Sequence, residues 1–287
     1  MVGVVFAGNP QKLELSILCD DAAVSENFMK EHGVSILIKL PNGHRWLFDA
    51  GTTDVFMENA KIMGERLDNL EGIMISHGHD DHGGGLAFYP RLGGEPPVYG
   101  HPLIWVKQYQ IKKGKQLRIC HIPYLARKNA GPHFKPLHDV TKLDENMYFF
   151  TDVKQEPGSY CPTYGKFYNE DGVGPWEGTD DATVAVDTPE GVVAIFGCGH
   201  AGYINILKAI KQKFPDKKIL SVVGGLHLKA ADEKILEKAA KFTDSVKAKK
   251  FTFYGGHCTG KNAIEYFKAK YGEDVVRPYA SGTVIKF

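Results

Sequence analysis

The 287-residue sequence predicts a single α/β domain in which helices pack on mixed β-sheets. Apolar runs of strand length alternate with longer segments of three- and four-residue apolar periodicity, which is typical of layered α/β folds. Two short turns each join a pair of strand-length runs and predict antiparallel hairpins. A composition of 43% hydrophobic and 24% charged residues provides an ordinary globular core and excludes disordered and collagen-like chains.

The expected strands are short runs rich in β-branched and aromatic residues. In chain order they are residues 13–19, 34–40, 45–48, 73–76, 147–150, 183–186, 192–196, 219–223, 251–254 and 283–285. The Pro41-Asn42-Gly43 turn separates the second and third runs, and Pro189-Glu190-Gly191 separates another pair. Both turns predict hairpins, so we expect sheets that are not purely parallel.

Four helices are expected from apolar periodicity, at residues 55–63, 203–214, 231–246 and 261–271. The third presents one apolar stripe that should pack on a sheet; its members are Ile235, Leu236, Ala239, Phe242 and Val246. Residues 155–178 are rich in Gly and Pro and are too long for an ordinary connection. We therefore expect this stretch to be an active-site loop.

Charge and cysteine usage exclude several classes of function. The chain carries 35 basic and 34 acidic residues, and this balance argues against a general nucleic-acid binder. It has no uninterrupted apolar run of membrane-spanning length and no leader-like N-terminus, so we expect a cytoplasmic protein without a membrane partner. The five cysteines are widely scattered, which predicts reduced thiols and not a disulfide framework.

The segment that carries chemistry follows the strand expected at 73–76. It reads Ser76-His77-Gly78-His79-Asp80-Asp81-His82 and continues into three glycines. Imidazole nitrogens and carboxylate oxygens are ligands of Zn²⁺ and neighbouring divalent cations. Three histidines and two aspartates within six residues therefore predict a metal site, in which Asp80 is more readily explained as a loop acid.

This His-x-His-x-Asp-His segment resembles the signature of the metallo-β-lactamase superfamily. The resemblance implies a four-layered αβ/βα sandwich with a dinuclear metal site at one edge of two sheets. It also implies that His77 and His79 bind one cation and that Asp81 and His82 bind the second. Two cations would lie about 3.5–4 Å apart in such a site.

The superfamily takes its further ligands from the ends of later strands. The strand expected at 192–196 ends in Gly-Cys-Gly-His, and the one at 251–254 ends in Gly-Gly-His-Cys-Thr-Gly. The resemblance thus makes His200 and His257 metal ligands and, together with Asp81, candidate catalytic residues. His227 follows a third such strand and is expected either to contact substrate or to support a ligand.

The sequence departs from the common superfamily pattern, in which a Gly-His motif precedes a strand that ends in Gly-Asp. The aspartate of that pattern bridges the two cations. Here Asp180-Asp181 and Gly197-Cys198 occupy the corresponding places, so the bridging carboxylate is missing. Cys198 as a soft ligand, or His200, is the candidate replacement. Asp180, Asp181 and Cys258 are expected to be either ligands or partners that orient the ligands.

Further segments match a narrower group within the superfamily. They are residues 31–35 (Glu-His-Gly-Val-Ser), the Asp180-Asp181 pair, and the glycine-rich strand ends at 197–202, 224–228 and 255–260. Together they resemble the group of 7,8-dihydropterin-6-yl-methyl-4-(β-D-ribofuranosyl)aminobenzene 5′-phosphate synthases. The resemblance covers most of the chain and is weakest between about residues 99 and 177, an expected insertion that would form part of the pocket wall.

The resemblance implies a metal-dependent enzyme that acts on a small phosphorylated, pterin-like substrate. One alternative is a transferase that releases pyrophosphate; another is a hydrolase of a phosphodiester, lactone or thioester. A third is a non-catalytic metal or redox protein, which the lack of a flavin-type domain disfavours. Zn²⁺ is the expected metal, although His/Asp ligation also suits Mn²⁺ and Fe²⁺.

One stretch within the expected insertion is unusually basic. Residues 107–145 contain nine Lys or Arg and three acidic residues. Arg118 and Arg127 are the candidate phosphate ligands, since a guanidinium can bind two oxygens at once. A solvated charged face is the competing explanation.

Overall fold

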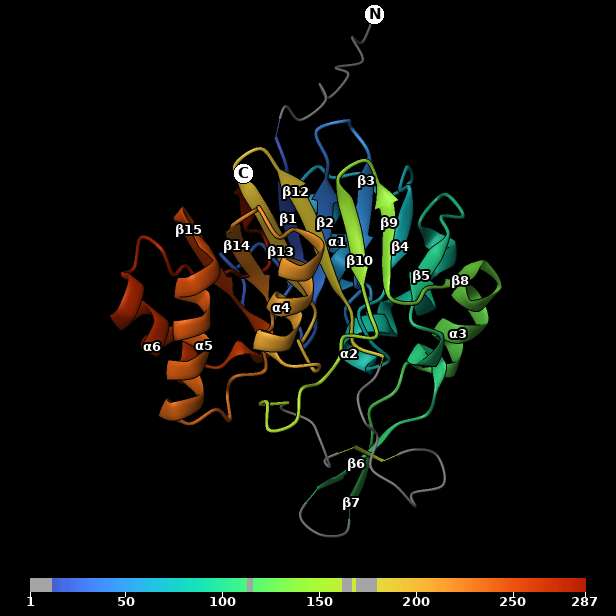
Figure 1. The fold of residues 1–287 in the computed structure, drawn as a ribbon. Coiled ribbons are helices and arrows are strands. Elements are labelled where there is room, and N and C mark those ends of the chain that lie inside the picture. The colour runs from blue at the N-terminus through green and yellow to red at the C-terminus, as the bar shows by residue number, and fades with distance from the viewer. Residues whose placement is uncertain (1–11, 113–115, 162–166, 169–179) are drawn as a thin grey trace, which may run out of the picture.

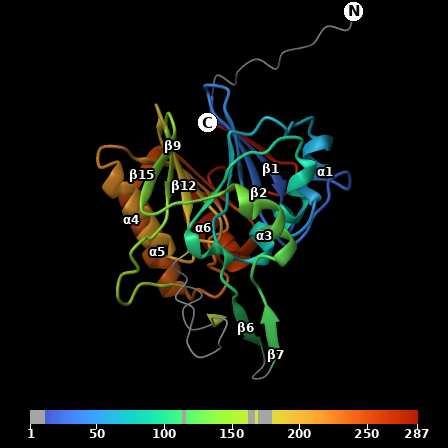
Figure 2. The same ribbon diagram turned by 90° about the vertical axis from the view of Figure 1, so that its right-hand side faces the viewer.

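The protein is described here from a computed structural model, which describes residues 12–112, 116–161, 167–168 and 180–287 (Figure 1). Two large mixed sheets face each other in the middle of the molecule. Seen from the side, α4 and α5 lie on one outer flank and α1 on the other, with both sheets between them (Figure 2). The αβ/βα sandwich expected from the resemblance is therefore confirmed.

The first sheet has the strand order β16-β1-β2-β3-β4-β5-β8. Its strands are β1 (Glu14–Cys19), β2 (Ser35–Lys39), β3 (Arg45–Phe48), β4 (Gly72–Met74), β5 (Val98–Gly100), β8 (Phe134–Pro136) and β16 (Val284–Lys286). Strands β16 to β3 pair antiparallel, whereas β3, β4, β5 and β8 run parallel. The Asn42-Gly43 turn joins β2 to β3 as expected, with Gly43 at φ 90°.

The second sheet has the order β15-β14-β13-β12-β10-β9. Its strands are β9 (Val140–Asp144), β10 (Met147–Phe150), β12 (Thr183–Thr188), β13 (Gly191–Phe196), β14 (Ile219–Gly224) and β15 (Lys247–Gly255). Strands β13, β14 and β15 are parallel, so their carboxyl ends meet at one edge of the sheet. A separate small sheet pairs β11 (Phe167–Tyr168), β6 (Tyr109–Lys112) and β7 (Gln116–Ile119).

The helices cover the outer faces of the sheets. They are α1 (Val55–Ile62), α2 (Asp80–Gly83), α3 (Tyr124–Ala130), α4 (Tyr203–Lys213), α5 (Glu233–Val246) and α6 (Lys261–Tyr271). Short 3₁₀ turns are η1 (Gly84–Arg91), η2 (Pro102–Trp105), η3 (Gly131–His133) and η4 (His257–Thr259). No helix of the described residues is long and apolar enough to cross a membrane.

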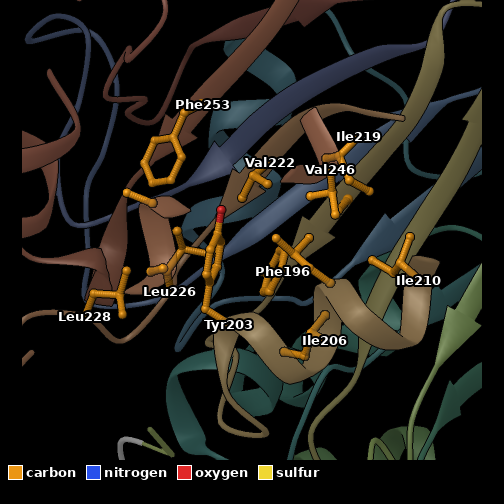
Figure 3. Close-up of a cluster of buried hydrophobic side chains, with 14 of the residues drawn as sticks. Phe196, Tyr203, Ile206, Ile210, Ile219, Val222, Leu226, Leu228, Val246 and Phe253 are labelled. Atoms are coloured by element: carbon orange, nitrogen blue, oxygen red, sulfur yellow. The ribbon is translucent and has the colours of Figure 1, made fainter. Parts of the chain in front are cut away.

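Three apolar clusters hold the layers together. One fills the space between the sheets and includes Ile17, Phe149 and Ile195. A second packs α4, α5 and α6 on the outer face of the second sheet, where Phe196, Tyr203 and Phe253 lie close to one another (Figure 3). The third packs α1, η1 and α3 on the first sheet. Both sheets are thus covered by side chains on both faces, which fixes their ends relative to each other.

The expected strands and helices are all present, with ends that match or are shifted by at most four residues. Strands β5, β6, β7, β8, β9 and β11 and helices α2 and α3 were not expected from the sequence. β8 contains Pro136 and lies at a sheet edge, and β9 is a largely half-exposed edge strand, so neither shows an apolar alternation.

The stretch from residue 99 to 177 serves more than one part of the fold. β8, β9 and β10 belong to the two main sheets, while β6, β7 and β11 form the small sheet below α2 in Figure 1. Much of the expected active-site loop at 155–178 lies outside the described residues. That the stretch forms a pocket wall therefore remains a prediction.

Candidate metal centre

Potential ligands gather where strands of both sheets end. His77 and His79 follow β4, and Asp81 and His82 lie on the short helix α2. From the second sheet, Cys198 and His200 follow β13, His227 follows β14, and His257 follows β15. The parallel strands thus deliver residues distant in sequence to one small region.

One group of three imidazoles converges on a single point. His77 Nε2 lies 2.8 Å from His79 Nδ1 and 3.1 Å from His200 Nε2. Nitrogens that share a tetrahedral Zn²⁺ at about 2.05 Å lie roughly 3.3 Å apart, which is close to this spacing. Burial and the neighbouring imidazoles hold the pKa of His77 and His200 well below their usual range, and lower that of His79 to about 4. All three rings are therefore neutral at pH 7, as metal ligation requires.

A second group lies beside the first and contains a carboxylate. Asp81 Oδ2 is 3.3 Å from His257 Nε2 and 3.9 Å from His82 Nε2. Burial alone would raise the pKa of Asp81, but His82 and His257 reverse this and hold it well below its usual value. Burial lowers the pKa of His82 and His257, but neighbouring acidic groups outweigh it and raise the pKa of both rings, so a bound cation would replace protons there. One carboxylate and two imidazole rings form a donor set that fits Zn²⁺ and similar divalent cations.

Asp49 orients His82, one of the potential ligands. Its Oδ2 accepts hydrogen bonds from His82 Nδ1 and Ser76 Oγ, each at 2.7 Å, and its Oδ1 accepts one from the Ser76 N–H. All three residues are fully buried. Because Nδ1 of His82 is engaged, Nε2 is left facing the ligand group.

Asp21 holds the ligand His257 and also a histidine at the rim. Its two oxygens lie 2.7 Å from His257 Nδ1 and 2.9 Å from His32 Nδ1. His32 Nε2 in turn is 3.3 Å from Asp81 Oδ2, and its side chain is about half exposed. His32 and Asp21 thus belong to the site, although the sequence suggested no role for either.

Two ligand-bearing loops contain backbone conformations that are uncommon outside glycine. His227 and His257 adopt φ values of 49° and 45° at the ends of neighbouring parallel strands. Such left-handed conformations cost energy and are concentrated at functional sites. The His257 N–H donates to Asp20 Oδ1 at 2.8 Å, which supports this turn. Burial raises the pKa of Asp20 to about 7.

The two aspartates that replace the superfamily's Gly-His motif support the loops of other ligands. Asp180 Oδ2 accepts the Gly78 N–H at 2.7 Å, between the ligands His77 and His79. Asp181 Oδ2 accepts the Ala201 N–H at 2.9 Å, next to His200. Burial raises the pKa of Asp181 to about 7.

Two buried thiols lie between the ligand groups and β14. Cys198 Sγ is 3.2 Å from His82 Nε2 and 3.2 Å from Cys258 Sγ. The His227 N–H donates to Cys258 Sγ at 3.3 Å, and the His227 ring lies against that of His200, with centroids 4.7 Å apart. Burial first and the Cys258 thiol second raise the pKa of Cys198, so without a bound cation it is a neutral thiol.

The predicted phosphate ligands are not part of this cluster as far as the structure describes it. Arg127 lies on the exposed side of α3. The side chain of Arg118, on β7, lies outside the described residues. Their phosphate-binding role therefore remains a prediction.

Fold and site together define an αβ/βα sandwich with potential metal ligands at the ends of strands in both sheets. The family model of the metallo-beta-lactamase superfamily matches residues 30–206, and the chain belongs to that superfamily. A solved metal-dependent hydrolase of the beta-lactamase superfamily, Tm1679, is similar over 96% of this chain and 99% of its own, with 27% identity and a TM-score of 0.79.

Two further proteins are similar to this chain. The 7,8-dihydropterin-6-methyl-4-(beta-D-ribofuranosyl)-aminobenzene-5′-phosphate synthase of Methanocaldococcus jannaschii is 28% identical over 98% of both chains. The Zn²⁺-bound PqqB of Methylobacterium extorquens shares the fold, with a TM-score of 0.56 at 12% identity over 96% of this chain and all of PqqB. The resemblance found in the sequence motifs is thereby confirmed.

Proposed function

We propose that the protein is a metal-dependent transferase. It would transfer a dihydropterin-6-ylmethyl group from the diphosphate of that group to the amine of a phosphorylated ribofuranosyl-aminobenzene. The observation that carries the metal dependence is the convergence of two three-residue groups, His77/His79/His200 and Asp81/His82/His257. The substrate class is supported by the similarity to the M. jannaschii synthase over nearly the whole chain.

Each ligand group would hold one divalent cation, and the His/Asp donor set favours Zn²⁺, Mn²⁺ or Fe²⁺. When bound, such a pair would polarise phosphoryl oxygens and stabilise the negative charge of a leaving pyrophosphate. In the proposed reaction a carbon–nitrogen bond forms between the pterin methylene carbon and the acceptor amine. The carbon–oxygen bond to the diphosphate breaks, and the amine releases one proton.

The chain's own side chains prepare the site for this chemistry. Asp49 and Asp21 fix the rings of His82 and His257 from the side away from the ligand group. His77 and His82 are 1% and 0% exposed, which limits water at the inner end of the site. His32 lies half exposed at the rim, where a substrate would enter. The partner that we propose is a small anionic molecule, and neither a nucleic acid nor a membrane.

A reducing, cytoplasmic environment belongs to the same proposal. All five cysteines are free thiols in the structure. Cytosolic proteins keep their thiols reduced, whereas secreted proteins tend to pair them in disulfides.

A hydrolase acting on a small phosphate ester is the second candidate. It is supported by the similarity to the solved metal-dependent hydrolase Tm1679, at 27% identity and a TM-score of 0.79. The two candidates differ in whether water or the aminobenzene riboside takes the group that is transferred.

The test is to incubate the metal-loaded protein with hydroxymethyl-dihydropterin diphosphate, with and without the aminobenzene riboside phosphate, and to measure pyrophosphate and the coupled product. Bis(p-nitrophenyl) phosphate is assayed in parallel. Pyrophosphate release that requires the acceptor and is lost in His79→Ala supports the transferase. Cleavage of the diester or the pterin diphosphate without coupling favours the hydrolase and contradicts the transferase.

A further inference from the structure

A thiol borders both ligand groups. Cys198 Sγ is 3.2 Å from Nε2 of His82, a member of the second group. The ligand atoms of Cys198, His82 and His77 all lie within 4.8 Å of one another, and His77 belongs to the first group. Cys198 therefore borders both groups at once.

The other candidates for a shared ligand are engaged elsewhere. His200 Nε2 lies 3.1 Å from His77 Nε2 and completes the first group. Asp180 and Asp181 accept hydrogen bonds from the Gly78 and Ala201 N–H groups, which position the loops that carry ligands. Asp49 uses both carboxylate oxygens on Ser76 and His82 Nδ1.

A chain of hydrogen bonds ends on the Cys198 sulfur. The His227 N–H donates to Cys258 Sγ at 3.3 Å, and the Cys258 S–H donates to Cys198 Sγ at 3.2 Å. Both cysteines are only 2% exposed, so this arrangement is shielded from water.

Glycine residues leave the space that the thiols occupy. A Cβ on Gly225 would lie 2.8 Å from Cys258 Sγ and 2.6 Å from the Gly197 carbonyl oxygen. A Cβ on Gly197 would lie 2.2 Å from Ser76 Oγ, beside the residue that binds Asp49. The backbone is thus folded closely around Cys198 and Cys258.

We propose that the Cys198 thiolate is a ligand shared by both cations and replaces the bridging carboxylate of the superfamily. This inference rests on the two-cation site of the proposed function. On binding, the S–H bond breaks and the proton leaves to solvent, and the sulfur donates one lone pair to each cation. A soft thiolate favours Zn²⁺, Fe²⁺ or Co²⁺ over Mg²⁺.

The test uses the full-length protein loaded with Co²⁺, because a thiolate bound to Co²⁺ gives an intense near-ultraviolet charge-transfer absorption that nitrogen and oxygen ligands do not give. We expect this band in the wild-type protein, with intensity that rises through the second equivalent of Co²⁺. The matched variants are Cys198→Ser, which should lose the band, and Cys258→Ser, which should keep it.

Cys198→Asp is the control in case Cys198→Ser fails to fold. A carboxylate at this position restores the common superfamily ligand, so this variant should fold, bind two Co²⁺ by elemental analysis and lack the band.

In a protein that binds two Co²⁺, four results would overturn the proposal. In the wild type these are the absence of the band with two Co²⁺ bound, or a band that saturates at one equivalent of Co²⁺. In the variants they are a band that persists in folded Cys198→Asp, or a band that is lost in Cys258→Ser but not in Cys198→Ser. The first two leave the dinuclear site intact. Binding of fewer than two Co²⁺ would overturn the shared ligand and the two-cation site together.

Discussion

Individual residues behind the ligands decide how well the site is organised. His82 can present Nε2 to a cation only while Nδ1 donates to a fixed acceptor, and the buried Asp49 is that acceptor. Asp21 performs the same task for His257. The quality of the site therefore depends on carboxylates that do not bind the cation themselves.

Asp49→Asn should weaken metal binding by roughly 10- to 100-fold. In the wild type both Ser76 and His82 donate hydrogen bonds to Asp49. The asparagine amide would present its own N–H₂ donor to one of them, so one hydrogen bond would be replaced by two donors that face each other. Isothermal titration of the metal-free variant with Zn²⁺ measures the change. Asp68→Asn, a surface partner of Arg66, serves as the control and should match the wild type. Wild-type affinity in Asp49→Asn would show that Asp49 does not position His82.

The ligands were more predictable from the sequence than their supports. His77, His79, Asp81 and His82 lie within six residues and are recognisable by type and spacing. Asp21 and His32 are separated from that cluster by more than 40 residues and reach it only through the packing of β1 and β2. A signal for Asp49 existed in its position directly after a strand and before Gly51, but an aspartate in such a place is also an ordinary turn residue.

At the scale of elements, close approach of strand ends brings the two sheets' ligands together. β13 ends at Phe196, and the next residue, Gly197, lies against Ser76, two residues beyond the end of β4. A Cβ at position 197 would lie 2.2 Å from Ser76 Oγ and 2.4 Å from Ser76 Cβ, so one of the two segments would have to shift.

Gly197→Ala should therefore lower metal content in the folded protein and destabilise it by about 1–3 kcal/mol, the usual cost of overpacking. Elemental analysis and urea unfolding measure the two effects. Gly131→Ala is the matched control, since its Cβ would meet no atom closer than 3.7 Å. Equal metal content and stability in both variants would contradict the proposed close packing.

A second inter-element contact is electrostatic. Glu65, just after α1, accepts hydrogen bonds from Ser16 on β1, from Lys39 on β2 and from Arg45 Nη2 on β3, the last at 2.7 Å. Although burial raises the pKa of Glu65, Lys39 and Arg45 lower it below the ordinary 4.5. The carboxylate therefore stabilises the fold above that value and loses its effect as the pH falls through the lowered pKa.

Glu65→Gln should lower the free energy of unfolding at pH 7 by about 1–3 kcal/mol, because it leaves charged partners without their carboxylate. The difference from wild type should shrink as the pH falls below about 4. Urea unfolding at several pH values measures it. Glu71→Gln, on the surface, should show no such loss. A difference that is constant with pH would rule out the charged interaction as its source.

Elements with a strong internal apolar pattern were predictable, whereas the edge strands β8 and β9, which lack one, were not. β13 and α5 show clear apolar patterns because one or both faces are buried. β8 and β9 are short strands at the ends of the two sheets, with mostly half-exposed or exposed residues. Their strand conformation is imposed by pairing with a neighbour, which local sequence does not reveal.

At the scale of the whole molecule, the core between the sheets maintains the distance across which the ligands meet. Phe149 on β10 is fully buried in that core. Phe149→Ala should lower the free energy of unfolding by about 3–5 kcal/mol through lost burial and cavity formation. Thermal or urea unfolding measures this, and Val140→Ala at an exposed position of neighbouring β9 should change it by less than about 0.5 kcal/mol. If both variants lowered the free energy of unfolding by a similarly small amount, the core between the sheets would not be tightly packed at Phe149.

The central claim is that two separate groups of three residues each hold one divalent cation. Its most direct test is the number of Zn²⁺ ions bound per chain, measured by elemental analysis after loading metal-free protein and removing free metal. The account predicts two ions in the wild type, one in His79→Ala and one in His257→Ala, with each variant folded by circular dichroism. Two tightly bound ions in either folded variant, or one or none in the wild type, would contradict it.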